Sequence, residues 1–141
     1  MYEFISGKAR SLSPTSVVVD NNGIGYFVNI SLNTFSAIKN KENVHLYVHF
    51  HVREDAQLFY GFADETEREL FRFLLSVSGV GANTARLILS SLTTEEVYQA
   101  ITQGNSSVLQ SVKGIGGKTA QRIVIDLKDK LSKADIDVEK V

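Results

Sequence analysis

Two short stretches combine paired glycines with a helix start, a combination suited to binding phosphate. Residues 77–89 read VSGVGANTARLIL, and residues 112–124 read VKGIGGKTAQRIV. The stretches form an internal repeat, because their matching positions keep one constant spacing along the chain. The matched pairs are Gly79 and Gly114, Val80 and Ile115, Gly81 and Gly116, Thr84 and Thr119, and Ala85 and Ala120.

Each repeat predicts a glycine–apolar–glycine turn between two helices. Glycine accepts backbone angles that other residues disfavour, and without a side chain it lets the backbone approach a ligand closely. The central residue, Val80 or Ile115, is expected to anchor the turn in the core. The next helix, starting at residues 83–85 or 118–120, directs unpaired N–H groups and the positive end of its dipole beyond the turn. Phosphate is the natural ligand for such a helix start.

One such turn is most often only a tight connection, but two matching copies favour helix–hairpin–helix motifs that hold DNA backbone without reading its sequence. The net charge of −1 argues against a binder that relies on a large basic patch. Contacts from backbone amides need few lysines, so a small net charge is compatible with DNA binding. Around the second hairpin, Lys113, Lys118 and Arg122 add local positive charge, and no acidic residue lies between residues 96 and 126. The predicted DNA-binding residues are Gly79, Val80, Gly81, Asn83, Thr84, Lys113, Gly114, Ile115, Gly116, Lys118, Thr119 and Arg122.

Five strands are expected in the first 62 residues. Strand patterns cover residues 2–10, 15–20, 24–31, 44–52 and 57–62, and the turn Asn21-Asn22-Gly23 predicts a hairpin. A short helix is expected at 32–39. Alternation places five apolar residues of the fourth strand on one face, namely Val44, Leu46, Val48, Phe50 and Val52. Five short strands with a helix after the third favour a small barrel of the OB type.

The apolar period changes from about 2 to about 3.6 residues at residue 63, which marks the expected domain boundary. Two segments with capping-box spacing, Asp64 to Glu67 and Thr93 to Glu96, predict helix starts, and the second helix is expected to end near Gly104. We therefore predict an α+β multi-domain protein. A five-stranded OB-fold barrel occupies residues 1–62, an all-α double helix–hairpin–helix domain occupies 63–131, and a flexible tail or linker occupies 132–141.

Composition excludes several other classes. The 141 residues are 43% hydrophobic and 22% charged, which is ordinary for a soluble globular protein. The absence of cysteine removes disulfides, thiolate metal sites and cysteine nucleophiles. Without a signal peptide or an apolar run of about 18 residues, we expect a cytoplasmic protein that makes no membrane contact. No phosphate-binding loop, serine-hydrolase elbow or metalloprotease pattern occurs, so we predict no catalytic residue, metal or cofactor.

Two weaker signals leave other roles open. His45, His49 and His51 share one face of the fourth strand and could supply two metal ligands, although solvated histidines are common on such faces. Glu54 and Asp55 could form a catalytic carboxylate pair, but a polar hairpin tip is the ordinary interpretation of adjacent acids.

Two rival functions remain. An OB protein that binds single-stranded DNA or RNA would stack bases on aromatic side chains. The candidates are Tyr26, Phe27, Phe59 and Tyr60, of which at least half are expected in the barrel core. A DNA glycosylase of the helix–hairpin–helix class would need a base-flipping pocket and a catalytic aspartate, for which Asp135 and Asp137 stand at a plausible distance.

The order of these parts resembles the RuvA family, the Holliday-junction-binding subunits of bacterial branch-migration complexes. The resemblance runs from Met1 to about Leu131 and rests on three pieces of sequence. These are Gly23-Ile24-Gly25-Tyr26, the stretch VREDAQLFYGF at residues 52–62, and both hairpins. The resemblance implies a non-catalytic protein that binds four-way DNA junctions in recombination, repair and the SOS response to DNA damage.

The resemblance also implies an assembly. A homotetramer, alone or paired with a second one, would accept an open junction on a flat basic face, with the hairpins on minor-groove phosphates of each arm. Glu54 and Asp55 would form a central acidic pin where the strands separate. The hexameric ATPase RuvB would supply the motor and bind through a C-terminal domain, and the resolvase RuvC would act on the same junction.

This chain departs from the family pattern in two places. Ala82 and Asn83 stand where the family often has proline and lysine, so the first hairpin is expected to hold phosphate less tightly. The chain ends at Val141, in what is expected to be the linker before the RuvB-binding domain, which is absent from these residues.

Overall fold

The computed structural model describes residues 1–134, which form two compact units. The units divide between Arg68 and Glu69, inside helix α2 (Glu65–Leu75). The expected boundary at residues 62–63 lies where the last strand ends, before α2 begins. The division between the two compact units falls a few residues later, after Arg68. None of the helices within residues 1–134 has the length and apolar character needed to cross a bilayer.

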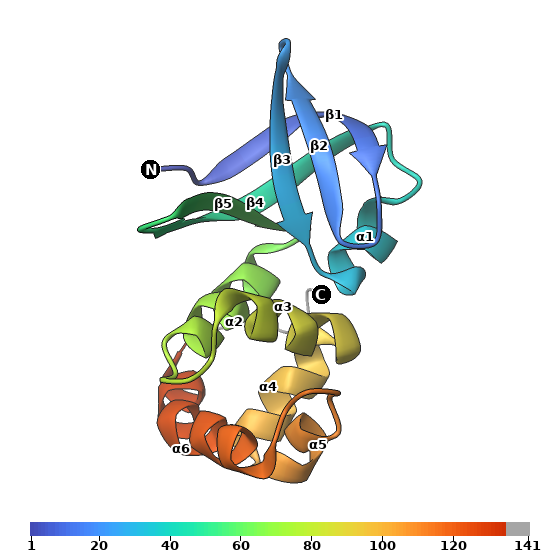
Figure 1. The fold of residues 1–141 in the computed structure, drawn as a ribbon. Coiled ribbons are helices and arrows are strands. Elements are labelled where there is room, and N and C mark those ends of the chain that lie inside the picture. The colour runs from blue at the N-terminus through green and yellow to red at the C-terminus, as the bar shows by residue number, and fades with distance from the viewer. Residues whose placement is uncertain (135–141) are drawn as a thin grey trace. The chain divides into compact units, whose positions relative to one another are not determined.

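The first unit is a closed five-stranded barrel (Figure 1). Its strands, in the order in which they pair around the barrel, are β1 (Phe4–Leu12), β2 (Ser16–Asn21), β3 (Ile24–Ile30), β5 (Ala56–Phe62) and β4 (Asn43–Arg53). The pairs are antiparallel except for β3 with β5. Helix α1 (Leu32–Ile38) follows β3 and is capped by the Ser31 side chain. The prediction of a five-stranded barrel with a helix after the third strand is confirmed.

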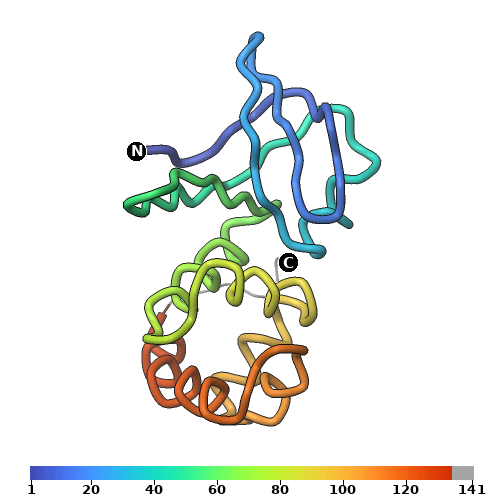
Figure 2. Tube along the Cα trace, viewed as in Figure 1, coloured from blue at the N-terminus to red at the C-terminus, as the bar shows by residue number. Residues whose placement is uncertain are grey.

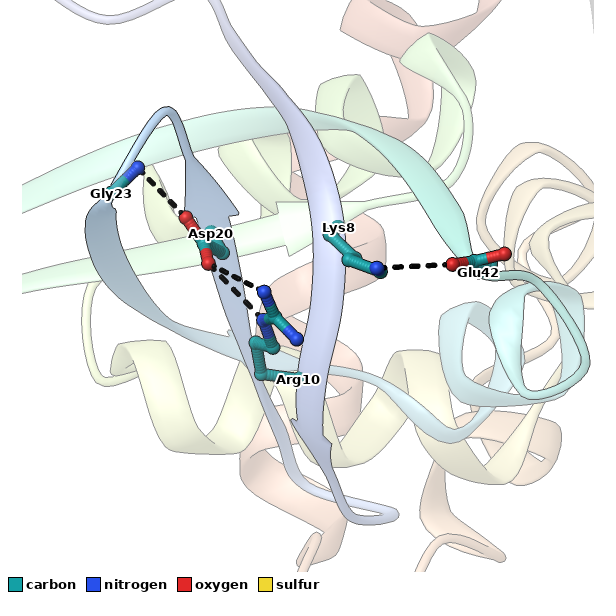
Figure 3. Close-up of polar contacts among 5 residues, drawn as sticks. All are labelled: Lys8, Arg10, Asp20, Gly23 and Glu42. Carbon is teal, nitrogen blue, oxygen red and sulfur yellow. Dashed lines mark hydrogen bonds and ion pairs between the residues drawn. The ribbon is translucent and has the colours of Figure 1, made fainter.

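The turn between β2 and β3 has the conformation that its residues predict. Asn22 and Gly23 both have positive φ, at 52° and 92°, as hairpin turns of two residues require. The Gly23 amide donates to Asp20 Oδ1 at 2.9 Å, and Arg10 Nη2 lies 3.1 Å from Asp20 Oδ2 (Figure 3). The Gly23 hydrogen bond, and then Arg10, lower the pKa of Asp20. Lys8 is paired with Glu42 on the same side of the barrel.

Only half of β4 buries the expected apolar face. Val44, Leu46 and Val48 are buried, whereas Phe50 is half-buried and Val52 is 57% exposed. The reason is pairing, because β4 contacts β1 only over residues 43–47 and continues with β5 alone as far as residue 53. We call the end of this hairpin, residues 49–60, the arm; at its base Phe59 and Tyr60 also pair with β3. Phe50 and Val52 therefore lie outside the buried core, although they continue the apolar alternation of the strand.

As far as residue 134, the second unit consists of the end of α2 and four further helices. These are α3 (Ala82–Ser91), α4 (Thr94–Thr102), α5 (Ser106–Gln110) and α6 (Gly117–Lys133). The capping box at α4 is confirmed, since Thr93 and Glu96 exchange hydrogen bonds of 2.8 and 3.1 Å. The expected tail begins inside α6, and its residues 135–141 lie outside the described part of the chain. The buried apolar residues of the helices include Leu70, Phe71, Leu74, Ile88, Leu89, Val97, Ile101, Leu109, Ile123 and Leu127.

Only half of the capping box predicted at the start of α2 forms. The Glu67 amide donates to Asp64 Oδ1 at 2.8 Å, as expected. The Glu67 carboxylate does not return to the helix start but accepts hydrogen bonds from Ser31 Oγ and Thr34 Oγ1, at 2.6 and 2.7 Å. Burial against α1 therefore takes this side chain away from the role that its spacing predicts.

Candidate nucleic-acid interface

The two glycine turns have the same backbone geometry. Their first glycines, Gly79 and Gly114, have φ of 92° and 91°, a conformation that favours glycine. In each turn the apolar residue donates its amide to the carbonyl three positions earlier at 3.0 Å (Val80 to Val77, and Ile115 to Val112). Val80 and Ile115 are each only 6% exposed, so both anchor their turn in the core, as predicted. Figure 2 traces the chain through both turns, which lie in the yellow-green segment before α3 and the orange segment before α6.

The second glycine of each turn is not in a strained conformation. Gly81 and Gly116 are the N-caps of α3 and α6, with ordinary extended φ of −89° and −82°. In each turn, the angle that favours glycine therefore occurs only at the first glycine. A β-carbon at either position would meet no heavy atom within 4 Å. Neither backbone conformation nor packing inside the chain requires glycine here.

The helix starts behind these glycines are open to a ligand. Helices α3 and α6 begin at Ala82 and Gly117, have no side-chain cap, and carry no acidic residue in the first turn. The first N–H groups of a helix have no acceptor within it. These amides and the helix dipole can therefore bind an anion in front of Gly81 or Gly116. Asn83, Thr84, Lys118 and Thr119 lie in these first turns.

The cations are distributed unequally between the two hairpins. Lys113, Lys118 and Arg122 are exposed beside the second hairpin, where Arg122 Nε lies 3.7 Å from Asp126 Oδ2 and is partly neutralised. Beside the first hairpin, Arg86 Nη2 donates to Asn83 Oδ1 at 3.4 Å. Sequence reasoning did not select Arg86. Its position three residues after Asn83, on the same helix face, was the available signal.

The two hairpins lie close together in the second unit. A β-carbon on Gly114 would be 3.8 Å from Leu87 Cδ2. Helix α3, which follows the first hairpin, therefore contacts the glycine turn of the second hairpin. The structure thus brings the residues predicted in both repeats into one region of the helical unit.

The acidic pair lies elsewhere, at the tip of the arm. Glu54 and Asp55 form the turn between β4 and β5, flanked by the paired residues Arg53 and Ala56. Both acids are exposed. The pair therefore presents negative charge to solvent at the tip of the arm and does not form a buried acid–base site.

Comparison with known proteins matches both units. Residues 1–61 match a family model described as the RuvA N terminal domain, and residues 71–129 match one described as a SAM-like Helix-hairpin-helix tandem. A protein of Christiangramia forsetii is 53% identical over 133 residues, covering 94% of this chain and 69% of the relative. The chain belongs to the RuvA family. This confirms both the resemblance and the predicted fold class.

Other relatives agree with this membership. A Bacteroides fragilis protein is 56% identical over 131 residues, and one of Flavobacterium psychrophilum is 49% identical over 138 residues. All three relatives are named Holliday junction branch migration complex subunit RuvA. This RuvA-family chain spans 65% of the length of the Bacteroides fragilis protein and 72% of the Flavobacterium psychrophilum protein.

The aromatic residues of this RuvA-family barrel mostly pack on one another. Tyr60 is 3% exposed, and Tyr26 and Phe59 are half-buried against the barrel core, with their rings 5.8 Å apart. Phe59 also contacts Phe50 and Tyr2 at the base of the arm. The expectation that at least half of the four candidate aromatics serve the core is confirmed, and only Phe27, at 59% exposure, stands on the surface.

The strand histidines do not converge on a common point. His45 is hydrogen-bonded to Ser6 and packs between the rings of Phe4 and Tyr47. His49 and His51 lie further along the arm, with ring centroids 5.9 Å apart. Within residues 1–134 no three His, Cys, Asp or Glu side chains gather closely enough to hold a metal ion. The glycosylase candidates Asp135 and Asp137 lie outside the described residues.

A buried polar cluster joins α2 to the barrel, and the sequence interpretation missed it. Glu67 is 1% exposed, and burial raises its pKa to about 7, although the hydrogen bonds from Ser31 and Thr34 oppose the rise. Arg68 is 5% exposed and donates a hydrogen bond to the Glu3 carbonyl at 2.8 Å. Its guanidinium also forms an ion pair with the Glu3 carboxylate and lies 5.5 Å from the centroid of the Tyr47 ring. These contacts explain why the barrel unit ends after Arg68.

Proposed function

We propose that this chain binds DNA through its backbone phosphates, using both hairpins, and without sequence specificity. The observation that carries the proposal is the pair Gly81 and Gly116. Each has an ordinary φ and open space where a side chain would be, so the chain itself does not require glycine at either place. A glycine there serves close approach of a ligand to the backbone. The uncapped helix starts behind both glycines make that ligand an anion.

The preferred substrate in this proposal is the four-way junction. Support comes from family membership, since the relatives are named Holliday junction branch migration complex subunits. It also comes from Glu54 and Asp55, which place exposed negative charge at the tip of the arm. Carboxylates repel phosphates, so they oppose continuous duplex laid across them more than a junction whose strands turn away.

The assembly in this proposal is a homotetramer, alone or with a second tetramer on the other face of the junction. Four copies would bring two carboxylates each to one centre and place a pair of hairpins along each arm. The chain itself would be non-catalytic, with RuvB supplying ATP-driven movement and RuvC cutting the same junction. In this proposal the chain acts in the bacterial cytoplasm, in recombination and repair.

Gel mobility of the 141-residue chain tests this function directly. A four-way junction, a duplex and a single strand of equal total length would be titrated at one fixed salt concentration. We expect the junction to bind most tightly, and its binding constant to fall with salt at about 0.9 log units per log unit of salt for each phosphate contact. Preference for the single strand would instead support an OB protein that stacks bases, and equal binding of junction and duplex would contradict the junction-specific proposal.

A further inference from the structure

The position of the acidic tip depends on how the base of the arm is held. Strand β4 pairs with β1 only as far as Tyr47, and β5 pairs with β3 only from Phe59 onward. Between these points, in the described part of the chain, β4 and β5 pair only with each other (Figure 1). A two-stranded hairpin is at best marginally stable by itself in water. Side chains packed at the base must therefore determine where Glu54 and Asp55 stand.

Tyr2 packs against both strands of the arm at this base. Phe50 of β4 and Phe59 of β5 are directly opposite each other, with ring centroids 4.8 Å apart. The Tyr2 ring meets both of these rings edge to face, at centroid distances of 5.1 Å and 4.9 Å. Aromatic rings favour this arrangement, and cross-strand side-chain contacts stabilise paired strands. Tyr2 thus joins the segment before β1 to both strands of the arm.

The chain next to Tyr2 is itself held in place. The Glu3 carbonyl accepts hydrogen bonds from the Val48 amide at 3.1 Å and from Arg68 Nη1 at 2.8 Å. The Glu3 carboxylate forms an ion pair with the same guanidinium, which is buried. These contacts attach the backbone beside Tyr2 to β4 and to the first turn of α2. The Tyr2 ring can therefore act as a fixed brace for the arm.

We propose that Tyr2 is a positioning residue, which braces the arm and so fixes the place of Glu54 and Asp55. The inference rests on the proposed function, in which these acids oppose continuous duplex. Glu54 follows Phe50 by four residues, a length of about 13 Å at about 3.3 Å per strand residue. A tilt of about 20° at the base would move the acids by about 4 Å, which is as large as the separation at which a carboxylate repels a phosphate appreciably in water.

The experiment compares the full 141-residue chain with its Tyr2→Ala variant in gel-shift titrations of junction and duplex at one salt concentration. Without the brace the acids can move away from duplex phosphates, so duplex affinity should rise while junction affinity stays close to the parent value. We expect the ratio of junction affinity to duplex affinity to fall by about fivefold, the change that corresponds to one carboxylate about 4 Å from a phosphate in bulk water. A loss of folded protein would lower both affinities and cannot raise either.

Three further variants make the result specific. Tyr2→Phe keeps the ring and should keep the parent ratio. Phe4→Ala is the matched control and should also keep the ratio, because Phe4 is an aromatic residue of similar exposure that packs against the His45 ring. Adding Tyr2→Ala to the combined change Glu54→Gln and Asp55→Asn should not raise duplex affinity further, because no carboxylate remains to be positioned.

The parent and the variants test different statements. If the parent does not prefer junction to duplex, the proposed function fails and the role of Tyr2 falls with it. If the parent prefers the junction and Tyr2→Ala has the parent ratio, the assignment of Tyr2 is wrong while the proposed function stands. The assignment is also overturned if Tyr2→Ala changes the oligomeric state in light scattering, if Phe4→Ala raises duplex affinity equally, or if Tyr2→Ala still raises it after Glu54 and Asp55 are neutralised.

Discussion

Replacing Glu67 by glutamine should change how the stability of the barrel unit depends on pH. The Glu67 side chain is 1% exposed and accepts hydrogen bonds from Ser31 Oγ at 2.6 Å and Thr34 Oγ1 at 2.7 Å. Removal from water disfavours the charged carboxylate by more than these two bonds favour it, so the pKa rises from 4.5 to about 7. Glutamine has a similar shape, retains one oxygen acceptor, and does not titrate.

The raised pKa fixes the sign and the size of the effect. The folded chain holds the Glu67 proton more tightly than the unfolded chain, so the stabilisation is fully present below about pH 4.5 and is lost as the pH rises through about 7. At about 1.36 kcal/mol per pH unit, the whole difference is about 3 kcal/mol. Between about pH 5 and about pH 8, we expect the parent to lose about 2.5 kcal/mol of unfolding free energy relative to Glu67→Gln.

Urea unfolding followed by circular dichroism, at constant ionic strength and several pH values, measures this difference. The comparison between variants removes the contributions of all other titrating groups. Glu65→Gln is the control, since it removes an exposed carboxylate from the same helix turn and should keep the parent profile. Parallel curves for the parent and Glu67→Gln over this pH range would refute the reasoning, as would a carbon NMR titration of the Glu67 carboxyl with a midpoint near 4.5.

Two further predictions concern DNA binding. Gly81→Val and Gly116→Val should fold, because a β-carbon at either position meets no heavy atom within 4 Å. Each should nevertheless lower affinity for junction and duplex alike by tenfold or more, as expected when hydrogen bonds of about 1.5–3 kcal/mol to a phosphate are removed. Gly116→Val should lower the affinity more than Gly81→Val, because more cations surround the second hairpin. Unchanged affinity of a folded Gly116→Val protein in a gel-shift assay would contradict the phosphate site. Glu54→Gln with Asp55→Asn should raise affinity for duplex and so reduce the ratio of junction affinity to duplex affinity. The reason is repulsion, because a carboxylate about 4 Å from a phosphate costs about 1 kcal/mol in bulk water and about 4 kcal/mol at a partly dry surface. Dissociation constants at one salt concentration measure the ratio, and an equal ratio in mutant and parent would leave these acids as an ordinary hairpin tip.

Local sequence rules predicted those features whose causes are local. Asn22 and Gly23 adopt the positive φ angles that a two-residue hairpin needs, and Thr93 and Glu96 cap α4 as their spacing requires. The same holds for the repeated turns, because the paired glycines and the apolar residue between them are explicit in the sequence. The resemblance to the RuvA family rested on such short segments, which is why the amino-acid sequence alone was enough to indicate it.

The tertiary structure decided what depends on contacts between distant segments. Phe50 and Val52 continue the apolar alternation of β4, but the strand leaves β1 before it reaches them, so they belong to the arm and not to the core. Glu67 has the spacing of a capping residue, but α1 packs against it and turns it into a buried acid.

The same division applies within the hairpins. The sequence determined that two glycines stand in each turn, since the repeat is explicit. Only the backbone angles show that Gly79 and Gly114 serve conformation, while Gly81 and Gly116 are free of any internal requirement. The physical reason is that a glycine's role depends on φ and on the space around a missing β-carbon, and both are set by the folded chain around it.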